Sequence, residues 1–223
     1  MIISAGNDIV DLQAIDTART NNPRFYTKFI TGAEAALYNQ PQLAHLPFEC
    51  FVWMLWSVKE SVYKFQQRHN PGLVFSPSKI VVESIKPPLS TRMADVANGP
   101  IEGKGFDAQL FYNSTIVFDL HTLYSQSIVN DSFIVTLVNN SNKFENMYWG
   151  VKPIDNSGPA YQSTEVRAFI LEKLRPVLAS THLNIIKKTS GCPVLYDGTI
   201  ETTVPVSLAH HGRYVAYAFL FSG

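Results

Sequence analysis

Apolar side chains recur at helical spacing along the segment from about Phe48 to Gln67. They lie three or four positions apart, so they share one face of an α-helix. The apolar positions are Phe51, Leu55, Val58, Val62 and Phe65. Pro47 precedes the segment and the turn Asn70-Pro71-Gly72 follows it, so the pattern predicts one long helix between these two breaks.

Two further helices are predicted from their start signals. Thr31 and Glu34 have the spacing of a capping box, which opens a short helix that stops before Pro41. In the last third of the chain, Ser163 is the expected N-cap of a helix that runs to Leu178. Its apolar positions are Val166, Phe169, Ile170, Leu174, Val177 and Leu178.

Segments rich in β-branched and aromatic residues predict strands between and after the helices. The first strand is expected within residues 2–12, running into a turn or a helix start. The other expected strands are residues 80–82, 108–112, 115–120, 133–138, 183–186, 194–196 and 214–221. The chain therefore has the mixture of elements that is typical of an α+β fold.

The chain divides into two units at a polar segment, residues 139–143, which is the best linker candidate. We expect a first α+β unit over residues 1–140 and a second over residues 141–223. Residues 127–135 resemble residues 207–215 with one gap, each read as a small polar turn that feeds a final apolar strand. This similarity favours a duplicated unit, and a cleft between two such units is a usual place for a cofactor pocket.

Composition narrows the class of protein. The 223 residues are 46% hydrophobic and 16% charged, as in folded globular proteins. Lysine plus arginine equals aspartate plus glutamate at 18 each, which argues against broad nucleic-acid binding. Cys50 and Cys192 offer neither a disulfide framework nor a zinc motif, so a reducing cytoplasm is expected. We expect no signal peptide, because the N-terminus has no basic region and reaches an acid at Asp8. We expect no membrane-spanning segment, because no apolar run approaches ~20 residues.

The long helix carries a second stripe, formed by Trp53, Trp56, Glu60 and Lys64. A carboxylate between Lys59 and Lys64 suits a site that holds a metal ion together with a polyphosphate. The carboxylate would bind the cation, and the lysines would neutralise phosphate oxygens. The alternative is an ordinary Glu–Lys pair on the surface of an amphipathic helix.

Asp8 and Glu60 are the best pair of metal ligands in the sequence. Two hard carboxylates that leave room for water and phosphate oxygens suit Mg²⁺. An alternative role for Asp8 is that of a helix N-cap. Asp11, which lies close by, is expected to be a solvated acid at a helix start.

Two basic clusters near the C-terminus are further candidates. In His210-His211-Gly212-Arg213 a histidine could donate to a phosphate, or the cluster could be an exposed turn. Lys187-Lys188 could likewise bind a phosphate or form a solvated turn. Walker loops, dinucleotide fingerprints and serine-nucleophile elbows are absent from the sequence. Phosphate chemistry would therefore depend on Mg²⁺ and basic side chains.

Three motifs resemble, in order and spacing, those of the 4′-phosphopantetheinyl transferases: Gly6–Leu12, Phe29–Glu34 and the Trp-x-x-Lys-Glu-Ser-x-x-Lys segment Trp56–Lys64. Residues 206–210 and 216–218 resemble that family's serine-histidine strand. The resemblance covers roughly residues 1–85 and 165–220. It implies a pseudo-twofold pair of α+β units, each with a long helix packed on a small, mostly antiparallel sheet.

The resemblance also implies an activity, the Mg²⁺-dependent transfer of the 4′-phosphopantetheine arm of coenzyme A to a serine of a carrier protein, with release of 3′,5′-ADP. Asp8 and Glu60 would hold Mg²⁺, Lys59 and Lys64 would contact phosphates of coenzyme A, and His210 would hold a phosphate from the second unit. Glu60, Lys64 and Asp8 would then be the catalytic residues, and Glu60 would accept the proton of the serine, directly or through a metal-bound water.

The sequence departs from the family pattern in several places. The histidine strand closes this chain, whereas in two-unit members it precedes the Gly-x-Asp segment, so the order matches the single-unit holo-acyl-carrier-protein synthases. Val10 stands where many two-unit members have a second acid. Ala209 replaces the usual serine, and Cys192 replaces the usual lysine before Pro193. Ala209 and Pro193 are still expected to contact coenzyme A, but the polar side chains that the family usually has at positions 209 and 192 are missing.

The expected partners are coenzyme A and an acidic acyl or peptidyl carrier protein of fatty acid or polyketide biosynthesis, with neither a nucleic acid nor a membrane. Arg19, Arg24 and Lys28 are candidate docking residues. A monomer with a single site is expected, because the single-unit relatives build their sites between subunits. Two other functions stay open: a catalytically silent scaffold that binds coenzyme A or a carrier, and a different Mg²⁺-dependent phosphate enzyme.

Overall fold

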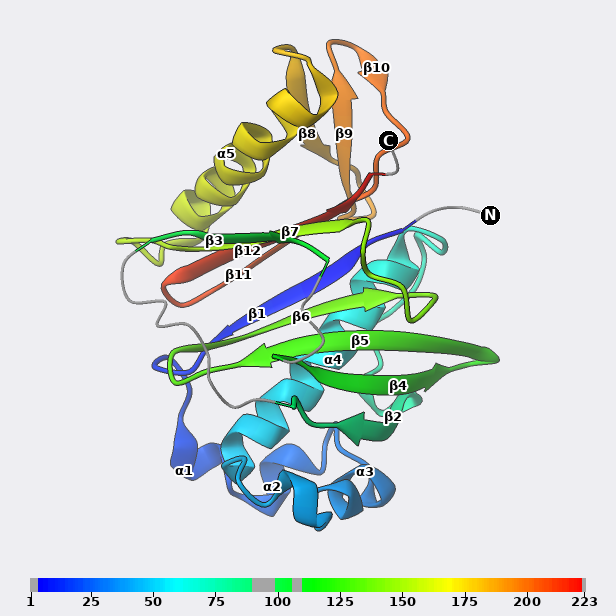
Figure 1. Cartoon of the computed structure of the whole chain (residues 1–223), viewed down its shortest axis with the longest axis vertical. Coiled ribbons are helices and arrows are strands. Elements are labelled where there is room, and N and C mark those ends of the chain that lie inside the picture. The colour runs from blue at the N-terminus through cyan, green and yellow to red at the C-terminus, as the bar shows by residue number, and fades with distance from the viewer. Residues whose placement is uncertain (1–3, 90–98, 106–109, 222–223) are drawn as a thin grey trace.

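Two main sheets, each packed against one twenty-residue helix, form most of the protein (Figure 1). The computed structural model describes residues 4–89, 99–105 and 110–221. Among these residues, no helix combines the length and the apolar character needed to cross a membrane. The α+β fold class is confirmed, and all neighbouring strands pair antiparallel.

The first sheet has the strand order β1-β6-β5-β4-β2. Its strands are β1 (Gly6–Asp11), β2 (Ile80–Lys86), β4 (Tyr112–Phe118), β5 (His121–Val129) and β6 (Phe133–Asn139). Helix α4 (Phe48–Gln67) lies across the sheet against β1 and β6 and has the predicted bounds. The five residues predicted for its apolar face are at most 3% exposed, so burial of this face fixes the rotation of the helix on the sheet.

Short helices cover the lower end of the first unit in Figure 1. They are α1 (Thr17–Thr20), α2 (Pro23–Tyr26) and α3 (Gly32–Leu37), with 3₁₀ turns η1 (Pro41–Leu43) and η2 (Pro77–Lys79). The predicted capping box of Thr31 and Glu34 is present at the start of α3. Phe25 and Phe29 pack edge-on or tilted against Trp53 and Trp56, which ties these helices to α4.

The second sheet has the order β11-β12-β7-β3. Its strands are β3 (Ile101–Lys104), β7 (Met147–Pro153), β11 (Val206–His211) and β12 (Tyr214–Leu220). Helix α5 (Pro159–Leu178) packs on β12 and β11, and a small sheet of β8 (Leu183–Lys187), β9 (Pro193–Asp197) and β10 (Ile200–Glu201) completes this half. Strand β3 belongs to the first unit by sequence position but pairs with β7.

The two halves share part of their strand order. In each half, the strand before the long helix pairs with the last strand, which also pairs with the strand that precedes it. These are β1, β6 and β5 in the first half, and β7, β12 and β11 in the second. A duplication would produce this order.

Strands β1 and β11 join the two halves without a shared backbone ladder. The backbone N–H of Asn7 donates to Ser207 Oγ at 3.1 Å, and the N–H of Asp11 donates to His211 Nδ1 at 2.9 Å. Both partners are 200 positions apart, so the two strands run in the same direction. Side chains of β11 therefore satisfy an edge of β1 that would otherwise be unpaired.

Several element predictions were wrong. Helix α5 begins at Pro159 with Gly158 at its N-cap, and not after Ser163, because a proline fits the first turn of a helix. Residues 127–132 are not one polar turn: β5 continues to Val129, and only a tight hairpin turn at Asn130 follows. Strands β3 and β7 were not predicted. The expected strand 108–112 lies partly outside the described residues, and its last residue, Tyr112, opens β4.

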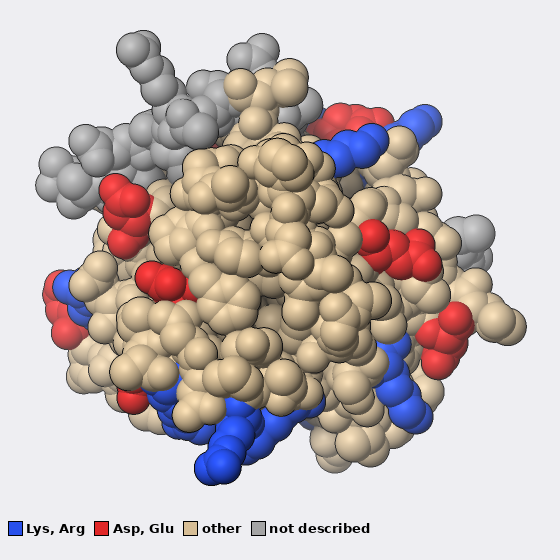
Figure 2. Space-filling model, turned by 90° about the horizontal axis from the view of Figure 1, so that it is seen from below, with Lys and Arg blue, Asp and Glu red and all other residues tan. Residues whose placement is uncertain are grey.

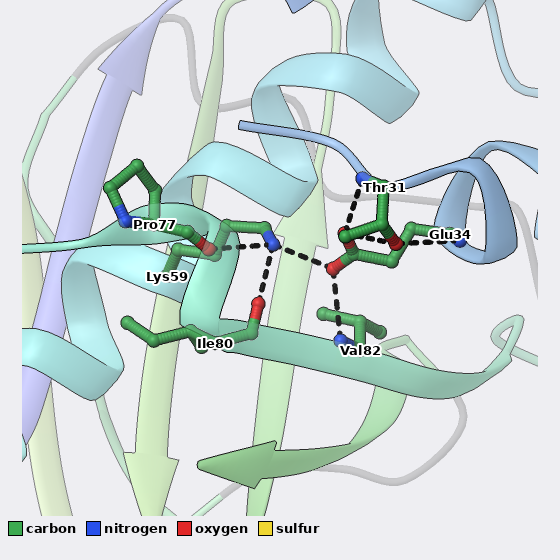
Figure 3. A network of polar contacts seen from close by, with 6 residues as sticks. All are labelled: Thr31, Glu34, Lys59, Pro77, Ile80 and Val82. Atoms are coloured by element: carbon green, nitrogen blue, oxygen red, sulfur yellow. Dashed lines mark hydrogen bonds and ion pairs between the residues drawn. The ribbon is translucent and has the colours of Figure 1, made fainter. Parts of the chain in front are cut away.

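A buried ion pair links α4 to the short helices (Figure 3). Lys59 Nζ lies 2.7 Å from Glu34 Oε1, and both side chains are fully buried. Lys59 also donates to the carbonyl oxygens of Pro77 and Ile80, while Glu34 accepts from the N–H of Val82. Burial lowers the pKa of Lys59, and the charge of Glu34 opposes that shift. Removing one member would leave the other buried and unpaired.

Replacing Lys59 with methionine tests this ion pair. Lys59→Met keeps a long side chain but leaves the Glu34 carboxylate without its ammonium, so we expect the free energy of unfolding to fall by about 3–5 kcal/mol. Urea denaturation measures it. The control is Lys79→Met, which changes an exposed lysine and should stay within about 0.5 kcal/mol of the wild type. A loss no larger than that of the control would contradict a structural role for Lys59.

Candidate active site

A cleft of about 640 Å³ lies at the junction of the two halves. Strand β1 and one face of α4 form its first wall, and β11, α5 and the segment from Lys187 to Pro193 form the second. The predicted stripe of α4 faces this cleft. The predicted site residues that line it are Asp8, Glu60, Lys64, Pro193, Ala209 and His210.

Gly6 brings β1 close enough to α4 to form the first wall. A Cβ atom at Gly6 would lie 2.2 Å from the carbonyl oxygen of Ser61, so a larger residue would push the strand off the helix. Two residues further along, Asp8 Oδ1 accepts from Lys64 Nζ at 3.0 Å, and Lys64 also donates to the carbonyl oxygen of Asn7. Asp8 lies within β1, so the alternative of a helix N-cap is wrong.

Glu60 lies half-buried one turn before Lys64 on α4. Among the described residues, its carboxylate has no hydrogen bond and no ion pair, since Lys64 pairs with Asp8 instead. The alternative of a Glu60–Lys64 surface pair is therefore wrong. Burial raises the pKa of Glu60, the charge of Lys64 opposes this shift, and the charge of Asp8 adds to it. A half-buried carboxylate beside a second carboxylate is a favourable place for a cation.

Asp8 and Glu60 fit a hard divalent cation such as Mg²⁺. In the described part of the chain, no group of three or more histidine, cysteine, aspartate or glutamate side chains could enclose a metal ion. Mg²⁺ is commonly bound by one or two carboxylates and completes its octahedron with water and substrate phosphate oxygens. Two carboxylates on one wall of an open cleft leave room for those ligands.

Asp11 does not line the cleft and is not the solvated acid that we expected. Its side chain is 2% exposed, and its oxygens accept from the N–H groups of Gln13 and Arg213. Gly212, with a φ of 53°, forms the turn between β11 and β12 beside it. A Cβ atom at Gly212 would lie 2.3 Å from Asp11 Oδ2. Asp11 therefore locks the β11–β12 turn to the end of β1.

His210 lies on the second wall and is exposed to solvent. His210 and His211 belong to strand β11, so the alternative of a turn is wrong. The exposure that this alternative predicted for His210 is confirmed. The cleft walls partly desolvate its imidazole, which lowers the pKa of His210, and the charges of Lys64 and Lys187 lower it further. A phosphate between these groups would reduce their mutual repulsion and favour the imidazolium.

The two lysines of the Lys187-Lys188 pair differ in position. Lys187 lines the cleft, whereas Lys188 pairs with Glu201 at 2.9 Å on the surface. Tyr63, Gln67, Ser163 and Arg167 also line the cleft and were not predicted. Helical spacing places Tyr63 and Gln67 beside the stripe of α4. Arg167 could not be identified in this way, because the face of α5 that turns towards the cleft depends on how the helix packs on the second sheet.

Lys59 does not line the cleft, which corrects its predicted contact with phosphate. Its ammonium is completely buried among Glu34, Pro77 and Ile80 on another face of α4. Residues one position apart on a helix point about 100° apart, so Lys59 and Glu60 cannot face the same ligand. Lys59 is therefore not part of the cleft.

A second groove, of about 520 Å³, adjoins the cleft at Trp53, Trp56 and His211. Its lining includes Arg19 and Lys28, but Arg24 is not among its lining residues. Figure 2 views the molecule from the end that carries α1, α2 and α3. This face is largely uncharged, and Lys and Arg side chains gather along its lower edge.

Part of the chain is similar to known proteins. Residues 4–94 match the family model of the 4′-phosphopantetheinyl transferase superfamily. Holo-[acyl-carrier-protein] synthases of Streptococcus equi subsp. zooepidemicus and subsp. equi are 29% identical over 106 residues, which is 48% of this chain and 83% of theirs. No solved structure matches the chain. The matched segment carries Asp8, Glu60 and Lys64, so this part of the chain is similar to the 4′-phosphopantetheinyl transferase superfamily.

Proposed function

We propose that the protein transfers the 4′-phosphopantetheine arm of coenzyme A to a serine of an acyl or peptidyl carrier protein. The reaction depends on Mg²⁺ and releases 3′,5′-ADP. The observation that carries this proposal is the unpaired carboxylate of Glu60 beside the Asp8–Lys64 pair, opposite His210 in one cleft. A cation and a polyphosphate together would compensate these charges.

Asp8 and Glu60 hold Mg²⁺ in this mechanism. When bound, the ion neutralises charge on the pyrophosphate and orients it. Lys64 already donates to Asp8 and to the carbonyl oxygen of Asn7, and its ammonium has a third proton that is free to bind a phosphate oxygen. Lys64 thus connects the metal ligand to the substrate.

The chemical step joins the serine oxygen to the β-phosphorus of coenzyme A. The bond from that phosphorus to the bridging oxygen of 3′,5′-ADP breaks, and the serine proton passes to Glu60. Positioning and charge neutralisation supply most of the catalysis in phosphoryl transfer, so few residues are needed.

The second wall holds the nucleotide end of coenzyme A. His210 and Lys187 bind phosphate, and Ala209 and Pro193 contact the ligand through their backbone and apolar atoms. Lys187 offers a cation on the same wall as Cys192, where the usual lysine is missing. Although the usual polar groups at positions 192 and 209 are missing, Lys187 can still provide a contact to phosphate.

The adjoining groove receives the carrier protein. Arg19 and Lys28 provide positive charge around an aromatic floor that includes Phe25 and Phe29. An acidic carrier would be attracted by these charges and would bring its serine towards the cleft. Arg24 would contribute only from outside the groove.

The two halves form a pseudo-twofold pair of units, over residues 1–140 and 141–223, in a monomeric protein. The shared strand order of β1-β6-β5 and β7-β12-β11 supports a duplication. The two walls of the cleft come from different halves, so one chain provides the complete site.

Glu60→Gln tests the proposed function. The amide keeps the shape but cannot hold the cation or take the proton, so transfer to a carrier protein should fall about a hundredfold or more, as read from the mass of the carrier. Glu49→Gln changes another acid of α4, outside the cleft, and should keep full activity. Near-normal transfer by a folded Glu60→Gln protein would refute the metal assignment. A wild type that binds coenzyme A without modifying any carrier would be a silent scaffold.

The same substitution should stabilise the metal-free protein. The pKa of Glu60 lies above its usual 4.5 in the folded state, so the folded state disfavours its ionised form. This penalty is absent below pH 4.5 and complete above the folded pKa. The melting temperature of Glu60→Gln should therefore exceed that of the wild type at about pH 8, and the difference should vanish towards pH 4.5. A lower melting temperature at pH 8 would mean that the ionised form is stabilised.

His210 should take up a proton when coenzyme A binds. Its pKa lies below the usual 6.5 in the free protein, and a bound phosphate raises it. The ratio of the affinity of the wild type for coenzyme A to that of His210→Asn should therefore rise as the pH falls towards and through 6.5. Calorimetry in two buffers of different ionisation enthalpy measures the uptake. Equal proton uptake by the wild type and by His210→Asn would exclude His210 from the phosphate contacts.

One coenzyme A should bind per chain. Asn130, near the position of the first unit that matches His210, accepts from the N–H groups of Ser132 and Phe133 in the β5–β6 turn. It is committed to that turn, and among the residues that the structure describes only the cleft between Asp8 and His210 has a full set of groups. Calorimetric titration should give a stoichiometry of one, and two nucleotides per chain would contradict the single site.

A further inference from the structure

His211 is a binding group that the proposed mechanism does not use. It lines both the cleft and the adjoining groove, so it lies where the two meet. Its ring centroid is 6.4 Å from that of Trp53. The side chain therefore faces whatever passes from the cleft into the groove.

The proton of His211 can be assigned from its partner. A backbone N–H can only donate, and that of Asp11 donates to His211 Nδ1 at 2.9 Å. Nδ1 is therefore the acceptor, and the neutral ring carries its proton on Nε2. Within the described part of the chain, Nε2 has no hydrogen-bond partner, and it is not among the buried unsatisfied atoms. His211 thus offers an accessible, oriented N–H donor.

His211 lies too far from the metal ligands to touch the reacting phosphorus. Along β1, Asp11 follows Asp8 by three residues, or about 10 Å. Along α4, Trp53 precedes Glu60 by seven residues, which is also about 10 Å. Two independent elements therefore place His211 about 10 Å from the Asp8–Glu60 pair.

The cleft differs in character on the two sides of that pair. Lys64 and Lys187 contribute positive charge next to His210, whereas Trp53 and Trp56 form the side that leads to His211. Coenzyme A differs along its length in the same way. Its nucleotide end carries the phosphates, and the pantetheine arm is uncharged, with two amide carbonyls and apolar methyl groups.

We propose that His211 recognises the pantetheine arm of coenzyme A, an inference that rests on the proposed function. The Nε2–H of His211 donates a hydrogen bond to an amide carbonyl of the arm, and Trp53 and Trp56 pack against the arm. The nucleotide then lies on the Lys64 and Lys187 side. A ligand without the arm makes no contact with His211.

Two substitutions distinguish the roles of the two ring nitrogens of His211. In His211→Asn, the amide oxygen can replace Nδ1 as the acceptor from Asp11, but nothing reaches the position of Nε2. In His211→Gln, the amide nitrogen reaches that position and restores a donor. The asparagine variant keeps the link between β11 and β1, and its melting temperature checks that link.

Calorimetry with coenzyme A and with 3′,5′-ADP, both with Mg²⁺, tests the proposal. His211→Asn should weaken coenzyme A binding about 3- to 10-fold, as for one neutral hydrogen bond, and leave 3′,5′-ADP binding unchanged. His211→Gln should recover most of the loss, and His210→Asn should weaken both ligands. In transfer assays, the KM for coenzyme A should rise in His211→Asn with little change in kcat.

Two results would overturn the proposal: no change for coenzyme A, or an equal loss for both ligands, since the second would place the nucleotide beside His211. Nuclear magnetic resonance of histidine side chains in the wild type removes any dependence on how a variant folds. The Nε2 signal of His211 should report the Nε2–H tautomer, shift with coenzyme A and stay in place with 3′,5′-ADP. If the wild type does not bind coenzyme A, the proposed function itself fails.

Discussion

Strand β1 must satisfy backbone hydrogen bonds on both of its edges, and the geometry of the cleft depends on how it does so. One edge pairs with β6 in a regular antiparallel ladder. The other receives Ser207 and His211, whose side chains accept from the N–H groups of Asn7 and Asp11. Because only side chains make this second contact, the two sheets meet here without merging, and β1 becomes a wall shared by both halves.

Much of this arrangement could be predicted from local sequence. The bounds of α4 follow from helical periodicity between two breaks, and the capping box of Thr31 and Glu34 is a signal within four residues. The co-location of Asp8, Glu60, Lys64 and His210 came from family motifs and not from local pattern. Strand β5 was missed because Ser125 and Ser127 are buried within it. Polar residues are usually exposed, so their presence in the sequence indicated a turn and not a strand.

Lys59 and Lys64 show where sequence reasoning needed more geometry. Both flank Glu60, but Lys64 follows it by one turn and Lys59 precedes it by a single residue. Helix geometry alone would have placed Lys59 on another face. Its partner, Glu34, could not be found that way, because the pair joins segments 25 residues apart that meet only after α3 has packed near β2. The buried position of Asp11 likewise depends on a turn about 200 residues away.

The contact between β1 and β11 has a consequence for how the site assembles. Hydrogen bonds from a backbone edge to side chains, with both strands running in one direction, do not require the strands to belong to one chain. When they do belong to one chain, the second wall faces the first at an effective concentration set by the connecting polypeptide, which is in the millimolar range for short flexible connections. Assembly of the cleft then becomes an intramolecular equilibrium, and the entropy of bringing the two walls together is lost during folding and not when the ligand binds.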